Sequence, residues 1–336
     1  MKEQVMTSNA GQLGGARARS SRGGKWSRYS ERTFYVFIAP WLLLGFLGLC
    51  LLPLAYALGL SFTNFNGFSG HWHWVGWSNY VEAIEDSDTW TGLWRTVLLA
   101  LITVPLGVVL GLGLAILLNS KMRGISVFRT LFYIPAIVPV VVSALIWKAI
   151  FDRDAGIING LIERLGGNIV LWLEDPMAFY ALIVMILWGV GGGMIIYLAG
   201  LQGVPPELRE AAAIDGAGRV RAFLAVDLPL LTPVIFFQVV IGIIGALQRL
   251  IEPFLLAPIG GTSSGTGGMS NPSLVPQGNQ LYMVNVYTQV FYNDRFGYGS
   301  ALLWILFLVV LALTALMFRA SSLWVYYEVD QEGAER

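Results

Sequence analysis

Charge is scarce in this sequence of 336 residues. Asp, Glu, Lys and Arg make up 12% of it, and their formal charges cancel to zero. Soluble domains carry about 25% charged residues. A neutral chain offers no bulk electrostatic attraction to nucleic acid, so we expect no nucleic-acid partner. The single cysteine, Cys50, excludes a disulfide within the chain and a CxxC metal site.

Motifs for metal and nucleotide chemistry are missing as well. The only histidines, His71 and His73, stand in HWHW, and without cysteine partners they are too few for a structural zinc site. We interpret HWHW as an aromatic loop at a membrane interface and expect no metal site. No GxxxxGK[ST] loop or HExxH motif occurs. An intramembrane enzyme is therefore disfavoured, and we expect no catalytic residues and no cofactor bound by this chain.

Apolar residues are abundant instead: they make up 56% of the chain, and the mean hydropathy is +0.65. About 20 mostly apolar residues cross a bilayer core. Six segments meet this criterion, so we predict an all-α integral membrane protein with six transmembrane helices. The segments are residues 34–62, 96–118, 128–150, 177–201, 228–257 and 298–318.

Lys and Arg are distributed unevenly between the polar segments. Fifteen of the 21 lie in residues 1–32, 119–129, 202–227 and the C-terminal end, whereas residues 63–94 contain none. Because cytoplasmic loops carry the excess of Lys and Arg, we expect both termini and segment 202–227 to be cytoplasmic.

Three regions follow from these patterns. Residues 1–32 are basic and rich in Gly and Ser, so we predict a disordered cytoplasmic tail near anionic membrane lipid. Residues 33–325 form the six-span domain, which includes a Gly/Ser/Pro-rich outer loop at 258–280. Residues 326–336 form a cytoplasmic C-terminal tail.

The cytoplasmic stretch PPELREAAAIDGAG (205–218) interrupts two uncharged apolar runs. Pro206 suits the first position of a helix, and Glu207 and Glu210 suit a first helical turn, where carboxylates meet the positive end of the helix dipole. Three alanines favour the helix, and Gly216 suits a left-handed closing position. We predict a helix of about nine residues, which is marginal by itself and must rest against something. The local pattern fits either a surface connector or a partner-binding helix.

A longer pattern separates these two interpretations. Glu210-Ala211-Ala212 is followed by Asp215-Gly216-Ala217 and then by Leu228-Pro229. With LAGLQGVP (198–205), FYIPAIVP (132–139) and VYTQVFYNDRFGYGSA (286–301), residues 34–325 resemble the permease subunits of binding-protein-dependent ABC importers, in particular the maltose-type sugar branch. The cytoplasmic signature of that family is the EAA loop, here within 202–227.

The resemblance implies a function and a place in a bacterial cell membrane. The short helix would be a coupling helix seated in a cleft of an ATP-binding subunit, with contacts from Glu207, Glu210, Ala211, Ala212, Asp215, Gly216 and Ala217. Two ATP-binding subunits would bind ATP and Mg²⁺. A second, homologous permease chain would complete the translocation path, and an extracytoplasmic solute-binding protein would deliver a sugar, a disaccharide or oligosaccharide. Leu208, Ile214 and Phe223 are expected to pack. The alternative is a secondary carrier or channel driven by an ion gradient.

Two groups of residues are candidates for the solute path. Gln238, Gly242, Gly245, Arg249 and Glu252 have spacings that place them on one face of a helix, with Arg249 and Glu252 able to pair. This face either lines the path, packs on the partner permease or holds an internal ion pair. Trp188 and Tyr197 flank a glycine cluster in the fourth span. The aromatic rings suit sugar faces, and the glycines suit close helix packing.

Overall fold

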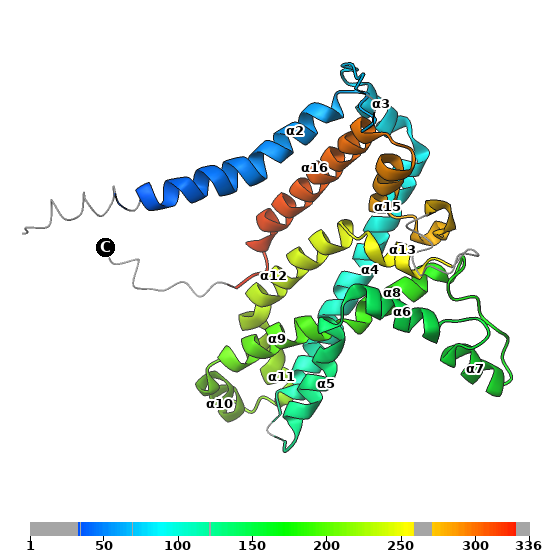
Figure 1. Ribbon diagram of the computed structural model, residues 1–336. Coiled ribbons are helices and arrows are strands. Elements are labelled where there is room, and N and C mark those ends of the chain that lie inside the picture. The colour runs from blue at the N-terminus through cyan, green and yellow to red at the C-terminus, as the bar shows by residue number, and fades with distance from the viewer. Residues whose placement is uncertain (1–32, 34, 69, 121, 259–270, 327–336) are drawn as a thin grey trace, which may run out of the picture. The chain divides into compact units, whose positions relative to one another are not determined.

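The computed structural model describes residues 33, 35–68, 70–120, 122–258 and 271–326 (Figure 1). The predictions for the basic tail 1–32, for most of loop 258–280 and for nearly all of the C-terminal tail lie outside these residues. The chain divides into two compact units, residues 1–57 and 58–336. The described residues form helices, with one isolated antiparallel bridge between Thr63 and Trp74 and no longer strand among them.

The first unit contributes most of the helix Tyr35–Ser61, which is long and apolar enough to cross a membrane. The helix contains the π-helical segment η1 (Leu42–Leu51) and then α2 (Leu52–Ser61), and no residue of η1 is buried. A helix that is apolar on all sides is stable only against lipid or other apolar surfaces. The prediction of a first span at 34–62 agrees with this helix.

Three further helices of the second unit pass the same test of length and composition. They are α4 (Ser87–Leu118), the continuous helix Arg219–Leu247 and α16 (Phe296–Ser321). The middle one is built from α11 (Arg219–Ala222), η2 (Phe223–Asp227) and α12 (Leu228–Leu247). Helix α4 begins nine residues before the predicted start at 96, because the Asp86 side chain caps it by accepting the N–H of Asp88 at 3.1 Å.

The third and fourth predicted spans are not straight helices. Residues 128–150 fall on α5 (Ile125–Ile137) and α6 (Val140–Ile150), which meet at 99°, and residues 177–201 on α8 (Ala178–Trp188) and α9 (Gly191–Gly203), which meet at 41°. Pro139 explains the sharper bend, because a proline disfavours helical geometry at the residue before it, and Val138 is extended. The described residues therefore give four straight spans, or six if each bent pair counts as one.

Shorter helices connect the spans. They are α3 (Ser78–Glu85), α7 (Ile157–Arg164), α10 (Pro206–Ile214), α13 (Ile251–Leu256), η3 (Pro272–Leu274), η4 (Gln277–Asn279), α15 (Tyr282–Tyr287) and η5 (Thr288–Tyr292). In the HWHW segment, His73 lies opposite Asn64, with 3.0 Å between the His73 Nδ1 and Asn64 Nδ2 atoms. No group of three His, Cys, Asp or Glu residues that could hold a metal ion occurs in the described part.

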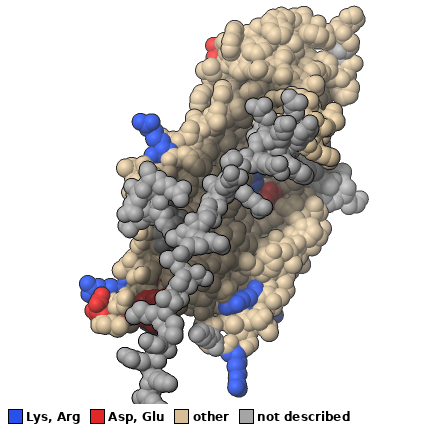
Figure 2. All heavy atoms as spheres, turned by 90° about the vertical axis from the view of Figure 1, so that its left-hand side faces the viewer, with Lys and Arg blue, Asp and Glu red and all other residues tan. Residues whose placement is uncertain are grey.

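Helix α4 is the central element of the second unit (Figure 1). Near its start Leu99 is buried in a core with Leu182 and Phe254, and near its end Ala115 is buried in a second core with Met194. A helix that joins both cores holds the two ends of the unit in register. The uncharged residues that cover most of the described surface in Figure 2 suit a lipid environment.

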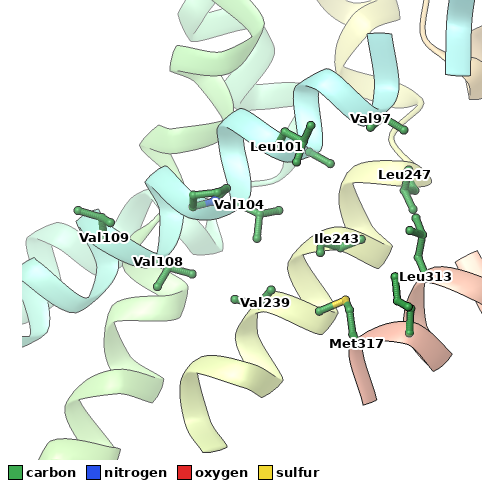
Figure 3. Close-up of a pocket in the computed structure, with 13 residues that line it drawn as sticks. Val97, Leu101, Val104, Val108, Val109, Val239, Ile243, Leu247, Leu313 and Met317 are labelled. Atoms are coloured by element: carbon green, nitrogen blue, oxygen red, sulfur yellow. The ribbon is translucent and has the colours of Figure 1, made fainter. Parts of the chain in front are cut away.

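An apolar groove of about 430 Å³ lies between α4, α12 and α16 (Figure 3). Val104, Ile243 and Met317 project into it from the three helices, and every lining side chain is apolar. Such a groove offers a polar solute no hydrogen bond, so it is no candidate for a sugar path.

Candidate functional site

The predicted short helix is present as α10, Pro206–Ile214, which has nine residues with proline in its first turn. Its C-terminus closes in a Schellman motif: Ala217 N–H donates to Ala212 O at 2.9 Å and Gly216 N–H to Ala213 O at 3.1 Å. Gly216 has φ +78°, the left-handed conformation that glycine adopts without strain. Glu207 lies in the first turn, but Glu210 lies in the second, one turn later than predicted.

One face of α10 points away from the rest of the chain. Glu207, Glu210, Ala211 and Ile214 follow the spacing of a single helical face, and all four are exposed. Ile214 is 87% exposed and Leu208 44%, so the expectation that both pack within the chain is wrong. Phe223 does pack, against the core around Leu201. The apolar residues of α10 are left available to a partner.

The remaining predicted coupling residues continue this surface. Asp215 and Gly216 are exposed at the C-terminus of the helix, and Ala212 and Ala217 are partly buried on its inner side. Small side chains leave the helix backbone accessible to a closely fitting surface. All seven predicted coupling residues therefore lie on or beside one short exposed helix.

An ion pair that no sequence pattern predicted attaches α10 to both neighbouring spans. Arg209 Nε donates to Asp227 Oδ1 at 2.7 Å, and Arg209 Nη2 donates to the Leu201 carbonyl at 2.9 Å. Leu201 belongs to α9 and Asp227 to η2, so one side chain joins three elements. Asp227 is only 8% exposed. Asp227 is the carboxylate directly before the apolar run 228–248, and this position was the sequence signal that could have marked it as a paired residue.

The pair forms one wall of a cavity of about 360 Å³ between α10 and the C-terminal end of α4, which contributes Ile116 and Asn119. Between α10 and the end of α4 there is thus a cavity rather than a packed apolar core, and the ion pair of Arg209 and Asp227 lies at its wall.

Some of the candidate residues for the solute path come together around one cavity. A cavity of about 170 Å³ between α4, α9 and α12 is lined by Tyr197, Gln238, Gly242 and Arg249 together. Tyr197 came from the fourth span and the other three from the fifth, so the structure joins two predictions that the sequence kept separate. Gly193 makes room: a Cβ there would lie 3.0 Å from Gln238 Nε2.

Three predicted members do not line this cavity: Trp188, Glu252 and Gly245, which is exposed. Trp188 instead packs edge-on against Trp147, with ring centroids 5.9 Å apart, and it is partly buried. Glu252 forms the predicted ion pair with Arg249 from outside the lining. The glycine cluster also serves close packing, because a Cβ at Gly191 would lie 1.8 Å from the Phe132 carbonyl oxygen.

The spacing of Gln238, Gly242, Gly245, Arg249 and Glu252 predicted one continuous helical face, but the helix is interrupted between them. Helix α12 ends at Leu247, residues 248–250 break the helix, and α13 resumes at Ile251. Arg249 sits in this break, and its Nε atom is buried without a hydrogen-bond partner among the described residues. An unsatisfied buried donor is costly, and a solute in the cavity would offer it an acceptor.

These features define a multi-pass helical membrane protein with a small exposed helix at one end and, among its spans, a cavity that Tyr197, Gln238 and Arg249 share. Residues 104–324 match the family described as the inner membrane component of binding-protein-dependent transport systems. The chain belongs to this family and is a permease subunit of an ABC importer. The ion-gradient alternative finds no support in these comparisons.

Curated relatives align with most of the chain. The probable ABC transporter permease YesP of Bacillus subtilis is 35% identical over 302 residues, 89% of this chain and 93% of that protein. The trehalose/maltose permease MalF of Thermococcus litoralis is 31% identical, with 83% and 90% covered, and the lactose permease LacF of Rhizobium radiobacter is 31% identical, with 88% and 95% covered. A bacterial alginate importer has the same fold, with a TM-score of 0.70, 19% identity and 88% and 98% covered.

Proposed function

We propose that this chain is one of two membrane subunits of an ATP-driven importer for a disaccharide or oligosaccharide. Relatives named for trehalose and maltose, for lactose and for arabinooligosaccharides support this substrate class. The observation that carries the proposal is the exposed α10, attached through Arg209 to both neighbouring spans.

The coupling role follows from the surface of α10. Ile214 and Leu208 expose apolar side chains beside Glu207 and Glu210, a combination that fits an apolar cleft with a basic rim. An ATP-binding subunit would supply that cleft. ATP binding can shift the permease only if the two states differ in their affinity for ATP, so the contact with α10 must differ between them. ATP and Mg²⁺ are held by that partner, not by this chain.

The solute path is assigned to the cavity that Tyr197, Gln238 and Arg249 share. Amide, phenol and guanidinium groups can hydrogen-bond sugar hydroxyls, and the ring of Tyr197 offers an apolar face to a pyranose. The cavity holds about 170 Å³, too little for a disaccharide, so a second permease chain would complete the path from the other side. A solute-binding protein would deliver the sugar from outside, and membrane lipid would cover the remaining apolar surface.

The coupling assignment is tested by copurification. The Glu210→Lys variant should lose the ATP-binding subunit while still inserting in the membrane, because it reverses the charge at the centre of the contact. Glu85→Lys is the matched control, since Glu85 is an exposed carboxylate of α3. Retention of the ATP-binding subunit by Glu210→Lys, or uptake that continues in ATP-depleted vesicles under an ion gradient, would refute the coupling role.

The path assignment is tested by uptake of maltose, lactose, diacetylchitobiose and arabinotriose into proteoliposomes with ATP inside. Gln238→Leu and Arg249→Ala should lower uptake of the transported sugar by about tenfold each, the factor expected for a lost hydrogen bond to a charged or desolvated group. Both variants should assemble with their partners. Wild-type uptake kinetics in Gln238→Leu, which breaks no ion pair, would exclude the cavity from the path.

A further inference from the structure

A second polar pocket, of about 470 Å³, opens at the end of α4 opposite to α10. Three elements form it: the first turns of α4, the segment from η3 to η4, and the α15–η5 helix. Eleven of its twelve lining residues carry a hydrogen-bonding side chain. They are Asp88, Thr91, Arg95, Ser273, Gln277, Gln280, Asn285, Thr288, Gln289, Tyr292 and Asn293. We call it the amide pocket, after its five Asn and Gln side chains.

The wall formed by the η3–η4 segment is held in place by specific hydrogen bonds. Gln280 Nε2 donates to the carbonyls of Pro272 and Val275, both at 3.1 Å. The Asp175 carboxylate accepts the backbone N–H of Gln277 at 2.6 Å. A wall tied down in this way is pre-organised, so a ligand does not have to order it.

The opposite wall carries a ladder of amides. Asn285 Nδ2 donates to Thr89 Oγ1 at 3.2 Å, Gln289 Nε2 donates to Asn285 Oδ1 at 3.4 Å, and Asn293 Nδ2 donates to Gln289 Oε1 at 3.1 Å. Each bond uses one N–H of an amide that has two, and a carbonyl oxygen accepts twice. The ladder therefore orients the amides and leaves each one with further capacity for a ligand.

The amide pocket contains one residue of each charge, and these two residues do not form an ion pair with each other. Asp88 and Arg95 lie two turns apart on α4, and neither forms an ion pair with any residue that the structure describes. Tyr292, 57% exposed, adds an aromatic face. The pocket thus offers hydrogen-bond donors, hydrogen-bond acceptors and one aromatic ring, and its formal charges cancel. These groups match a molecule with many hydroxyls and an apolar ring face.

We infer that the amide pocket is a saccharide-binding site, distinct from the cavity at Tyr197, which receives the sugar on the outer side before it enters the membrane. The inference rests on the proposed function and adds a first stop to its path. The volume lies within the range of about 300–1,000 Å³ typical of small-molecule pockets. The apolar groove of Figure 3 has a similar size but no polar group, so size alone does not favour the amide pocket.

The position of the pocket follows from the length of α4. Asp88 and Arg95 lie near its start, whereas Ile116 and Asn119 beside the Arg209 cavity lie at its end. A helix of 32 residues extends about 48 Å at 1.5 Å per residue, more than the hydrocarbon core of about 30 Å. If α10 contacts an ATP-binding subunit inside the cell, the amide pocket faces outside.

Protection of an introduced cysteine tests the site directly. In a Cys50→Ser background, the Thr91→Cys variant of the assembled complex in nanodiscs is labelled with a charged thiol reagent, without binding protein. Each of maltose, lactose, diacetylchitobiose and arabinotriose is added separately. The sugar that the complex imports should slow labelling roughly tenfold at about ten times its Kd. Asn168→Cys, an exposed site outside the pocket, should label at an unchanged rate.

A second arm separates a sugar site from a protein contact. If sugar-free binding protein protects Thr91→Cys and no imported sugar does, the pocket is a docking surface and the inference is overturned. If sugars are imported and neither protects, the inference also fails, while the proposed function stands. If no disaccharide or oligosaccharide is imported, the proposed function fails, and protection by any of the four sugars still supports a saccharide site.

Uptake kinetics provide an independent measure. Gln289→Leu removes the middle of the amide ladder with little change in size, and it should raise the half-saturating concentration of sugar-loaded binding protein or slow uptake about tenfold. Asn168→Leu removes an amide outside the pocket and should leave uptake unchanged. Equal uptake by both variants would overturn the inference.

Discussion

At the scale of single residues, Arg209 joins three elements at the end of the chain that carries α10. It belongs to α10, yet its hydrogen bonds end on Leu201 of α9 and Asp227 of η2. A displacement of α10 by a partner therefore acts on both adjacent spans at their ends. Its side chain is 35% exposed and that of Asp227 11%, so the pair is screened less than a surface ion pair.

We predict that Arg209→Met and Asp227→Asn each lower ATP-driven uptake at least about tenfold and destabilise the permease by about 1–3 kcal/mol, the cost of losing a hydrogen bond to a partly buried charge. Uptake in proteoliposomes and thermal unfolding measure the two effects. Both variants should retain the ATP-binding subunit and its basal ATP hydrolysis, because Arg209 lies on the inner side of α10. Full uptake in either variant would contradict a role in transmission.

Asp86 determines where α4 begins. Burial alone would raise the pKa of this carboxyl, but hydrogen bonds from the Thr89 hydroxyl, the Asp88 backbone N–H and the Tyr298 hydroxyl stabilise the carboxylate and hold its pKa below the ordinary value of 3.8. Since the folded pKa is the lower one, the carboxylate stabilises the fold above pH 3.8, and this contribution is lost as the pH falls through the folded pKa.

We predict that Asp86→Ala costs about 1 kcal/mol at neutral pH, as the loss of a helix cap does, and that Asp86→Asn costs less because an amide oxygen still caps. Thermal unfolding in detergent at a series of pH values measures both. The gap between wild type and Asp86→Asn should narrow below pH 3.8. Glu85→Gln, which changes an exposed carboxylate that caps no helix, is the control. A gap that stays constant with pH would contradict this account.

At the scale of elements, the sequence predicted α10 with both of its ends, but it predicted the bends within the spans only in part. Pro206, the alanines and Gly216 act through local backbone preferences, so they predict the helix and both of its ends. Pro139 is also a local signal, and it explains why α5 and α6 meet at an angle instead of forming one span. By contrast, Pro135 lies inside α5 without ending it.

The break at Arg249 had a weaker signal. Residues 248–250 contain no proline or glycine, and the spacing of polar residues continued across them. Pro253, however, lies four residues after Arg249, where a proline ring clashes with the carbonyl of a continuous helix and removes its hydrogen bond. Beyond the break, Phe254, Leu255 and Leu256 of α13 are buried in the core with Leu99 and Leu182.

The pairing of Arg209 with Asp227, 18 residues apart, was out of reach of a local pattern.

The C-terminus of α10 gives a prediction at this scale. Gly216 has φ +78° and open space around it, so a methyl group there meets no neighbour but strains the backbone, at about 1–2 kcal/mol. Gly216→Ala should reduce the ATP-binding subunit that copurifies, and Gly216→Asn should reduce it less, because Asn tolerates this conformation. Gly218→Ala is the matched control: its φ is −69° and its surroundings are also open. Equal losses from both alanine variants would contradict the argument.

At the scale of the whole molecule, the two polar ends of α4 must lie on opposite sides of the membrane. Loop 165–177 belongs to the end with the amide pocket, because Asp175 accepts hydrogen bonds from the backbone of η4. Segment 202–227, with its arginines, belongs to the other end. Because cytoplasmic loops carry the excess of Lys and Arg, we predict that this second end is cytoplasmic.

This orientation predicts two opposite labelling patterns in a Cys50→Ser background. Asn168→Cys should react with a membrane-impermeant thiol reagent in intact spheroplasts, and Ile214→Cys should react only in inside-out vesicles. Both positions are exposed in the isolated chain. Ile214→Cys should in addition be shielded when the ATP-binding subunits are present and become reactive when they are stripped off with urea, because the exposed face of α10 is covered only in the complex. Labelling of Ile214→Cys from outside would show that the topology is the reverse of the predicted one. It would contradict both the coupling role of α10 and an outward-facing amide pocket.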